Sequence, residues 1–115
     1  MANLAKHIPA NEGVAKAWAN LDGTGTIAER DSHNISGYVD NGTGDYTFTI
    51  SADMSSANRA VQGTCNEAQS ANNSRMVQEI QVPAAGAARL SCTVSSSTAT
   101  VDCENVYFCV FGDLA

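Results

Sequence analysis

Positive charge is scarce in this chain of 115 residues, which has six Lys and Arg against twelve Asp and Glu and a net charge of −6. Lys and Arg form no run anywhere in the sequence. Nucleic-acid binding needs a clustered basic surface, so we expect no nucleic-acid partner. We interpret the acidic excess as a contribution to solubility rather than as a cation-binding feature.

Long apolar segments are also missing. No stretch approaches the roughly 20 apolar residues of a membrane span, and we expect no membrane partner. The opening MANLAKHIPANEG contains neither a continuous apolar run nor a cleavage-like pattern after one, which argues against a secretory signal. Synthesis and folding in a reducing cytoplasm are therefore expected.

Aromatic side chains are few, with one Trp, three Tyr and three Phe. The length indicates a single domain, and folding at this length buries roughly two-thirds of the surface that the unfolded chain exposes. Because small residues replace aromatic ones, the core is expected to be thin. We expect neighbouring subunits to help cover the domain.

Catalytic motifs are absent. The sequence has no Gly-x-Ser-x-Gly elbow, and nothing around His7 or His33 links either histidine to a nucleophile. The carboxylates are scattered over expected turns, as ordinary surface groups are. We expect no enzymatic activity, no catalytic residues and no cofactor.

The four cysteines, Cys65, Cys92, Cys103 and Cys109, include no closely spaced pair such as Cys-x-x-Cys, so their spacing predicts no metal site. A disulfide between Cys92 and Cys103 is compatible with a hairpin in which these residues are opposed. For a protein made in a reducing cytoplasm, we favour four small, buried and reduced thiols.

Alternation of apolar and polar residues, interrupted by glycine turns, is what the sequence does contain. The clearest case is GYVDNGTGDYTFTIS at residues 37–51, where two alternating runs flank Asn-Gly and Thr-Gly and predict a hairpin. The side chains expected to face inward are Ile35, Gly37 and Val39 on one strand and Tyr46, Phe48 and Ile50 on the other.

Two registers keep both inward sets on one face. In one, Asn41-Gly42 forms a two-residue turn with Val39 opposite Gly44. In the other, residues 41–44 form a four-residue loop with Val39 opposite Tyr46. The pattern does not decide between them.

The remaining alternation predicts strands at 14–21, 26–30, 59–65, 76–82, 89–95, 99–103 and 106–111. In the first of these, Trp18 lies opposite the small face formed by alanines and Leu21, and we interpret it as a subunit contact. The last strand is apolar on both faces and should lie in the middle of a sheet, covered on its outer side by a second subunit.

The strands at 89–95 and 99–103 are predicted to form a second hairpin around Ser97-Thr98. In this hairpin Cys92 lies opposite Cys103, and Val94 lies opposite Val101. In the strand at 76–82, Met76, Ile80 and Val82 share one side, which Gln78 interrupts.

Seven to nine short strands without a helical period predict an all-β fold, an antiparallel β-sandwich. A jelly-roll-like strand order is possible but is not decided by the pattern. The expected organisation is an extended arm at 1–13 and a sandwich domain at 14–115.

The run KAWANLDGTGTIAERDSHNISGYVDNGTGDYTFTIS (Lys16 to Ser51), together with the closing VYFCVFGD, resembles a small β domain of tailed-bacteriophage virion proteins that often ends tail fibres. The resemblance covers most of the chain from about Ala15 onward. It implies a virion structural protein, assembled in a bacterial host, that forms a trimeric knob, spike, head fibre or decoration. The arm would then bind other virion proteins, since only about a dozen residues take the place of a fibre shaft.

The alternative function is a receptor- or glycan-binding module at a fibre tip. The loops at 53–58 and 66–74 offer Asn, Asp and Gln side chains suited to a host surface glycan. They contain no aromatic residue on which a sugar would stack, and for that reason the structural role is preferred.

Overall fold

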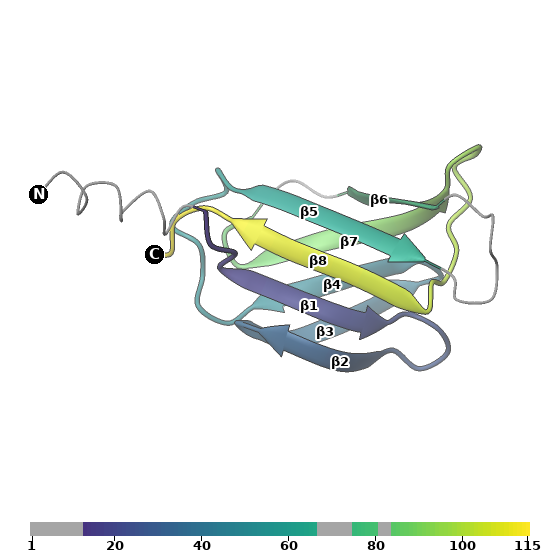
Figure 1. The fold of residues 1–115 in the computed structure, drawn as a ribbon, viewed down its shortest axis with the longest axis horizontal. Helices are drawn as coiled ribbons and strands as arrows, with labels where there is room; N and C mark the ends of the chain where they lie inside the picture. The colour runs from purple at the N-terminus through teal and green to yellow at the C-terminus, as the bar shows by residue number, and fades with distance from the viewer. Residues whose placement is uncertain (1–12, 67–74, 81–83) are drawn as a thin grey trace, which may run out of the picture.

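The computed structural model describes residues 13–66, 75–80 and 84–115, and within these ranges the protein consists of strands and turns without a helix. Eight strands form two antiparallel sheets (Figure 1). The strands are β1 Ala17–Asp22, β2 Ala28–His33, β3 Ile35–Gly42, β4 Asp45–Ile50, β5 Ala60–Asn66, β6 Arg75–Glu79, β7 Ala87–Val94 and β8 Asn105–Phe111. The predicted all-β sandwich is confirmed. The expected arm, except for Gly13, and most of the expected loop at 66–74 lie outside the described residues.

The first sheet has the strand order β2-β1-β8-β5, and the second sheet has the order β3-β4-β7-β6. Figure 1 shows the two sheets packed face to face, with the first sheet nearer the viewer. β8 lies between β1 and β5, which confirms the interior position predicted from its two apolar faces.

The core lies between the sheets and uses every second residue of β1, β4 and β8. Phe48 of β4 and Phe108 of β8 stack across the interface, with ring centroids 4.6 Å apart and planes 14° apart. The other fully or nearly fully buried apolar residues are Ala17, Ala19, Leu21, Tyr46, Ile50, Met54, Ala88, Leu90, Cys92, Cys103, Val106 and Val110. Several of these side chains are small, being alanine or cysteine.

The expected register of the central hairpin is wrong by one residue. The structure pairs Tyr38 with Phe48, the register shifts between Asp40 and Gly42, and the turn is formed at Thr43-Gly44. The extra residue at this shift is a β-bulge, which Asp40 stabilises because its carboxylate accepts a hydrogen bond from the Gly42 N–H (3.0 Å). A shift of one residue exchanges the two faces of a strand, so Tyr38 packs inward and Val39 is exposed.

The second expected hairpin is also wrong in part. Its first strand is β7, but its second strand is reduced to a single bridge between Thr93 and Thr100. The Cys92 carbonyl therefore accepts a hydrogen bond from Val101 rather than facing Cys103. The chain leaves the second sheet here because it must cross to the first sheet to begin β8, and the Cys103 carbonyl already bonds Gly23 of the turn after β1.

In β6, Met76 and the following Ile80 are exposed, whereas Val77 on the opposite side packs against the core. Gln78 belongs to the exposed row, and its polarity is the feature of the sequence that indicates the solvent side. Val82 lies outside the described residues.

Candidate binding face on the outer side of the first sheet

The outer side of the first sheet carries a compact group of side chains from three of its four strands, β1, β8 and β5. Residues directly opposite each other in a sheet project to the same side. Trp18 pairs with Cys109, which pairs with Gln62; in the next row Asn20 pairs with Tyr107, which pairs with Thr64. We call these six residues the aromatic face.

The two rings of the aromatic face are partly open to solvent, with Trp18 36% and Tyr107 37% exposed. They are diagonal neighbours, and Cys109 lies opposite Trp18 on the strand that carries Tyr107. An open groove of about 720 Å³ is lined by all six residues of the face. Burial raises the pKa of the Cys109 thiol, so this part of the groove is uncharged near neutral pH.

Polar groups of the aromatic face are available to a ligand. Within the described part of the chain, the side chains of Gln62, Thr64 and Tyr107 form no hydrogen bond with the rest of the protein. Asn20 is more constrained, because its side-chain oxygen lies 3.5 Å from an Arg30 nitrogen. The face therefore combines two aromatic surfaces with free amide and hydroxyl groups.

Ionisable residues border this face on the β2 side. His33 pairs with Trp18 and Asp31 pairs with Asn20, so the two rows continue onto the edge strand. Arg30 contacts the Asp22 carboxylate at 3.5 Å and donates to the Glu104 carbonyl at 2.7 Å. Hydrogen bonds from Thr24, with a smaller contribution from Arg30, lower the pKa of Asp22, which keeps this border ionised.

The second sheet has no comparable group among the described residues. Its exposed apolar side chains include Val39 on β3 and Met76 on β6, which are the two opposite edge strands. Isolated exposed apolar residues are normal on protein surfaces. The clustering of Trp18 and Tyr107 on central strands is what distinguishes the aromatic face.

Alternation along the first strand predicts that Trp18 lies on an outer face, but the polar groups of a sugar site were predicted in the loops at 53–58 and 66–74. In the structure, the aromatic and polar groups meet on the sheet instead. Alternation shows the outward rows of β1 and β5, whereas β8 is apolar on both faces. Bringing the three rows together requires the strand order β1-β8-β5. Of the two histidines, His33 lies beside Trp18, and His7 lies outside the described residues.

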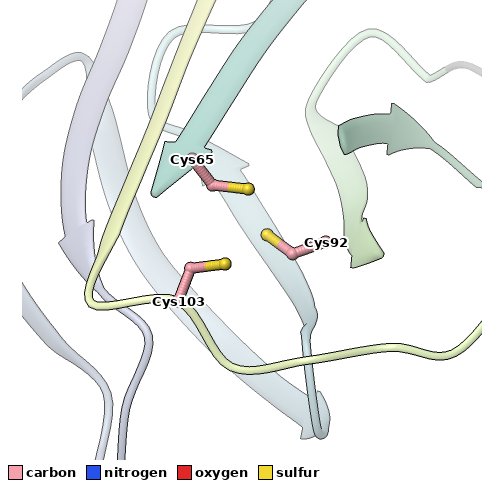
Figure 2. A group of neighbouring side chains, drawn as sticks. All are labelled: Cys65, Cys92 and Cys103. Carbon is pink, nitrogen blue, oxygen red and sulfur yellow. The ribbon is translucent and has the colours of Figure 1, made fainter. Parts of the chain in front are cut away.

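Three of the four cysteines meet elsewhere, at one end of the core. Figure 2 shows the sulfur atoms of Cys65, Cys92 and Cys103 pointing toward one another from β5, β7 and the segment before β8. The three Sγ atoms lie within 4.8 Å of one another, and none of the four cysteines is in a disulfide. Cys92 and Cys103 are thus close to each other, which the sequence allowed, although they are not opposed in a hairpin. The proximity of Cys65 to this pair was not expected.

No protein-family model and no curated protein matches the chain. A solved structure, the tailspike of phage phiAB6 in complex with three-repeated oligosaccharides of the Acinetobacter baumannii surface polysaccharide, is similar in fold, with a TM-score of 0.54 and 15% sequence identity. The match covers 84% of this chain and 20% of the tailspike chain, so the protein spans about a fifth of that chain's length. At this identity the likeness concerns the fold, which this chain shares with part of a phage tailspike.

The described residues also contain no helix of the length and apolarity that crossing a membrane requires.

Proposed function

We propose that the protein is a non-catalytic structural module of a bacteriophage virion that associates with copies of itself through the aromatic face. The observation that carries the proposal is the position of Trp18 and Tyr107, which lie partly exposed on the two central strands of the first sheet. The fold shared with part of a phage tailspike supports the virion context.

Self-association follows from the two apolar sides of β8. One side, with Phe108 at its centre, is buried in the core. The other side contributes Tyr107, Cys109 and Phe111 to the surface, next to Trp18 of β1. Large aromatic residues at the centre of a patch with a polar border are typical of protein interfaces, and a second copy provides a matching apolar surface. A trimer is the state implied by the resemblance to fibre-end domains.

Light scattering of the purified full chain tests this proposal. We expect an oligomer, and we expect Trp18→Ala to dissociate it while the circular dichroism spectrum stays that of a β protein. Met76→Ala is the matched control, because Met76 is an exposed apolar residue of the other sheet and its loss should leave the oligomer intact. A folded wild-type protein that is monomeric at high concentration contradicts the proposal.

A second candidate function, carbohydrate binding, is favoured by one specific observation. The aromatic face sets two rings beside the free side chains of Gln62 and Thr64 along one open groove. Sugars are bound through stacking on aromatic rings and hydrogen bonds to amides and hydroxyls, and sites of this kind are mostly apolar with a few polar groups. The fold neighbour is a tailspike solved with oligosaccharides.

Gln62→Ala and Thr64→Ala separate the two functions. If the groove binds a glycan, the wild type should give a signal on a glycan array that both variants lose, while light scattering gives both variants the same molar mass as the wild type. If the face serves self-association alone, the wild-type protein gives no array signal, and only Trp18→Ala changes its behaviour.

We further propose that residues 1–13 attach the module to another virion protein. Removing them should abolish incorporation into particles assembled in the bacterial host, without changing the oligomeric state of the purified domain. Normal incorporation of the truncated chain would rule out this role.

A further inference from the structure

Cys65, Cys92 and Cys103 form a three-sulfur cluster that joins the two sheets. Cys65 belongs to β5 of the first sheet, Cys92 to β7 of the second sheet, and Cys103 to the segment that crosses between them. Figure 2 shows that the three side chains converge on a common point. Cys92 and Cys103 are completely buried, and Cys65 is partly buried.

Backbone hydrogen bonds hold the cluster in place. The Cys92 N–H donates to the Gly44 carbonyl (2.7 Å), and the Cys92 carbonyl accepts from Val101 (3.0 Å). The Cys103 carbonyl accepts from the Gly23 N–H (2.9 Å), and Cys65 is paired with Val106 within the ladder between β5 and β8. The three Cβ positions are therefore set by the sandwich itself.

The separation of the sulfur atoms suits a common ligand. All three Sγ atoms lie within 4.8 Å of one another. A cation bound to thiolates at a metal–sulfur distance of about 2.3 Å requires sulfur atoms that are roughly 3.8 to 4.0 Å apart. Small rotations of the side chains are enough to meet this requirement, because the sulfur atoms already face one another.

We propose that Cys65, Cys92 and Cys103 bind a thiophilic cation, Zn²⁺, which links the two sheets at this end of the core. Three sulfur ligands and no nitrogen or carboxylate in the cluster select a soft metal over Mg²⁺ or Ca²⁺. The partly buried Cys65 marks the side on which the cation enters and on which a water molecule completes a tetrahedral shell. This inference is independent of the proposed self-association.

Binding requires three deprotonations and no redox step. Each thiol releases its proton to solvent as its zinc–sulfur bond forms, so one Zn²⁺ and three thiols give one Zn²⁺ tris-thiolate and three protons. Because each ligand must lose its proton, zinc affinity should increase with pH.

Co²⁺ titration of the full chain, kept reduced with a phosphine, tests the proposal. We expect near-ultraviolet sulfur-to-cobalt charge-transfer absorption that saturates at one equivalent, is displaced by Zn²⁺, and strengthens as the pH increases. Cys65→Ser should lose this absorption. Cys109→Ser is the matched control, since Cys109 lies outside the cluster, and it should bind as the wild type does.

The thermal midpoint provides a second readout. A ligand that binds only the folded state stabilises it, so Zn²⁺ should raise the midpoint of the wild type and of Cys109→Ser but not that of Cys65→Ser. Cys103→Ala serves in place of Cys65→Ser if the latter does not fold, as judged by circular dichroism. Three results would overturn the proposal: no cobalt absorption in the reduced wild type, undiminished binding by both cluster variants, or a disulfide between two cluster cysteines with no metal binding after its reduction.

Discussion

Arg59 and Glu79 form an ion pair between the two sheets, with Arg59 Nη2 2.7 Å from Glu79 Oε2. Arg59 directly precedes β5 of the first sheet, and Glu79 is the last residue of β6 in the second. The Arg59 side chain is 1% exposed, and it also donates to the carbonyls of Ala84 and Ala87 at 2.8 Å each. One guanidinium group therefore connects three segments at the side of the sandwich where β5 and β6 meet.

Glu79→Ala should lower the free energy of unfolding by about 3 kcal/mol, because it leaves a buried guanidinium without its counter-ion. The value is at the low end of the range for buried pairs, since Glu79 is itself 20% exposed. Urea unfolding measures the effect. Asp22→Asn is the matched control: it breaks the Asp22–Arg30 pair, in which both side chains are about one-third exposed, and should change stability little. Equal losses in the two variants would show that the burial of Arg59 has no energetic role.

Gly44→Ala should be far more destabilising than Gly25→Ala. Both glycines adopt a left-handed conformation, with φ of 64° and 57°, so the backbone cost of a Cβ is similar, about 1–2 kcal/mol. At Gly44 a Cβ would also collide with the Val101 carbonyl oxygen and lie 2.8 Å from that of Cys92, whereas at Gly25 it would meet nothing within 4 Å. The difference between the two variants in urea unfolding therefore measures the packing of the Thr43-Gly44 turn. Similar losses in both variants would contradict this packing.

The same turn shows what could and could not be predicted from the sequence. Alternation correctly identified β1, β4, β5 and β8, the buried sides of β1 and β4, and the interior position of β8. It failed for Val39 on β3, because a hydrogen bond from Gly42 to the Asp40 side chain stabilises a bulge, and one extra residue reverses the side of the residues just before it. A second register shift, between Ile35 and Gly37, returns Ile35 to the core side, as expected. Bulges of this kind leave no periodic signal.

The aromatic face and the cysteine cluster could not be predicted from the sequence, for a different reason. Both depend on which strands become neighbours. Trp18 and Thr64 share a face only because β8 lies between β1 and β5, and Cys65 meets Cys92 only because two sheets pack together. Local spacing carries no information about such contacts, so the absence of a Cys-x-x-Cys pair did not exclude a three-sulfur cluster.

Stability should decrease at alkaline pH as Tyr38 ionises. Burial, and then its hydrogen bond to Glu29, raise the pKa of Tyr38 to about 12 from the ordinary value of 10.0. The folded state thus retains the proton between pH 10 and 12, where the unfolded chain releases it. The contribution is complete below pH 10 and is lost as the pH approaches 12.

Urea unfolding between pH 8 and 11.5 checks this dependence, with absorbance at 295 nm reporting tyrosinate. Tyr38→Phe should be less stable than the wild type at pH 8, because it lacks the bond to Glu29, and its stability should decrease less steeply above pH 10. Some decrease should remain, since burial and Asp102 also raise the pKa of Tyr46. Parallel curves for wild type and Tyr38→Phe would contradict the assignment to Tyr38.

Asn34 occupies the corner between β2 and β3 in a left-handed conformation, with φ of 58°. Its side-chain oxygen accepts from the Ala52 N–H (2.7 Å), and its amide nitrogen donates to the carbonyls of Lys16 and Ala52 (3.1 Å each). This side chain thereby connects the segment before β1, the β2–β3 corner and the segment after β4. Asn tolerates the left-handed region better than most residues, so one residue satisfies both requirements.

Replacing Asn34 separates its two roles. Asn34→Gly removes the three hydrogen bonds but accepts the backbone conformation, and should cost about 2–3 kcal/mol. Asn34→Ala loses the same bonds and adds left-handed strain, so it should be less stable than Asn34→Gly by about 1 kcal/mol. Urea unfolding of both variants gives the two contributions by difference. An alanine variant more stable than the glycine variant would contradict the proposed left-handed strain. It would mean that the backbone at this corner leaves the left-handed region once the side-chain hydrogen bonds are removed.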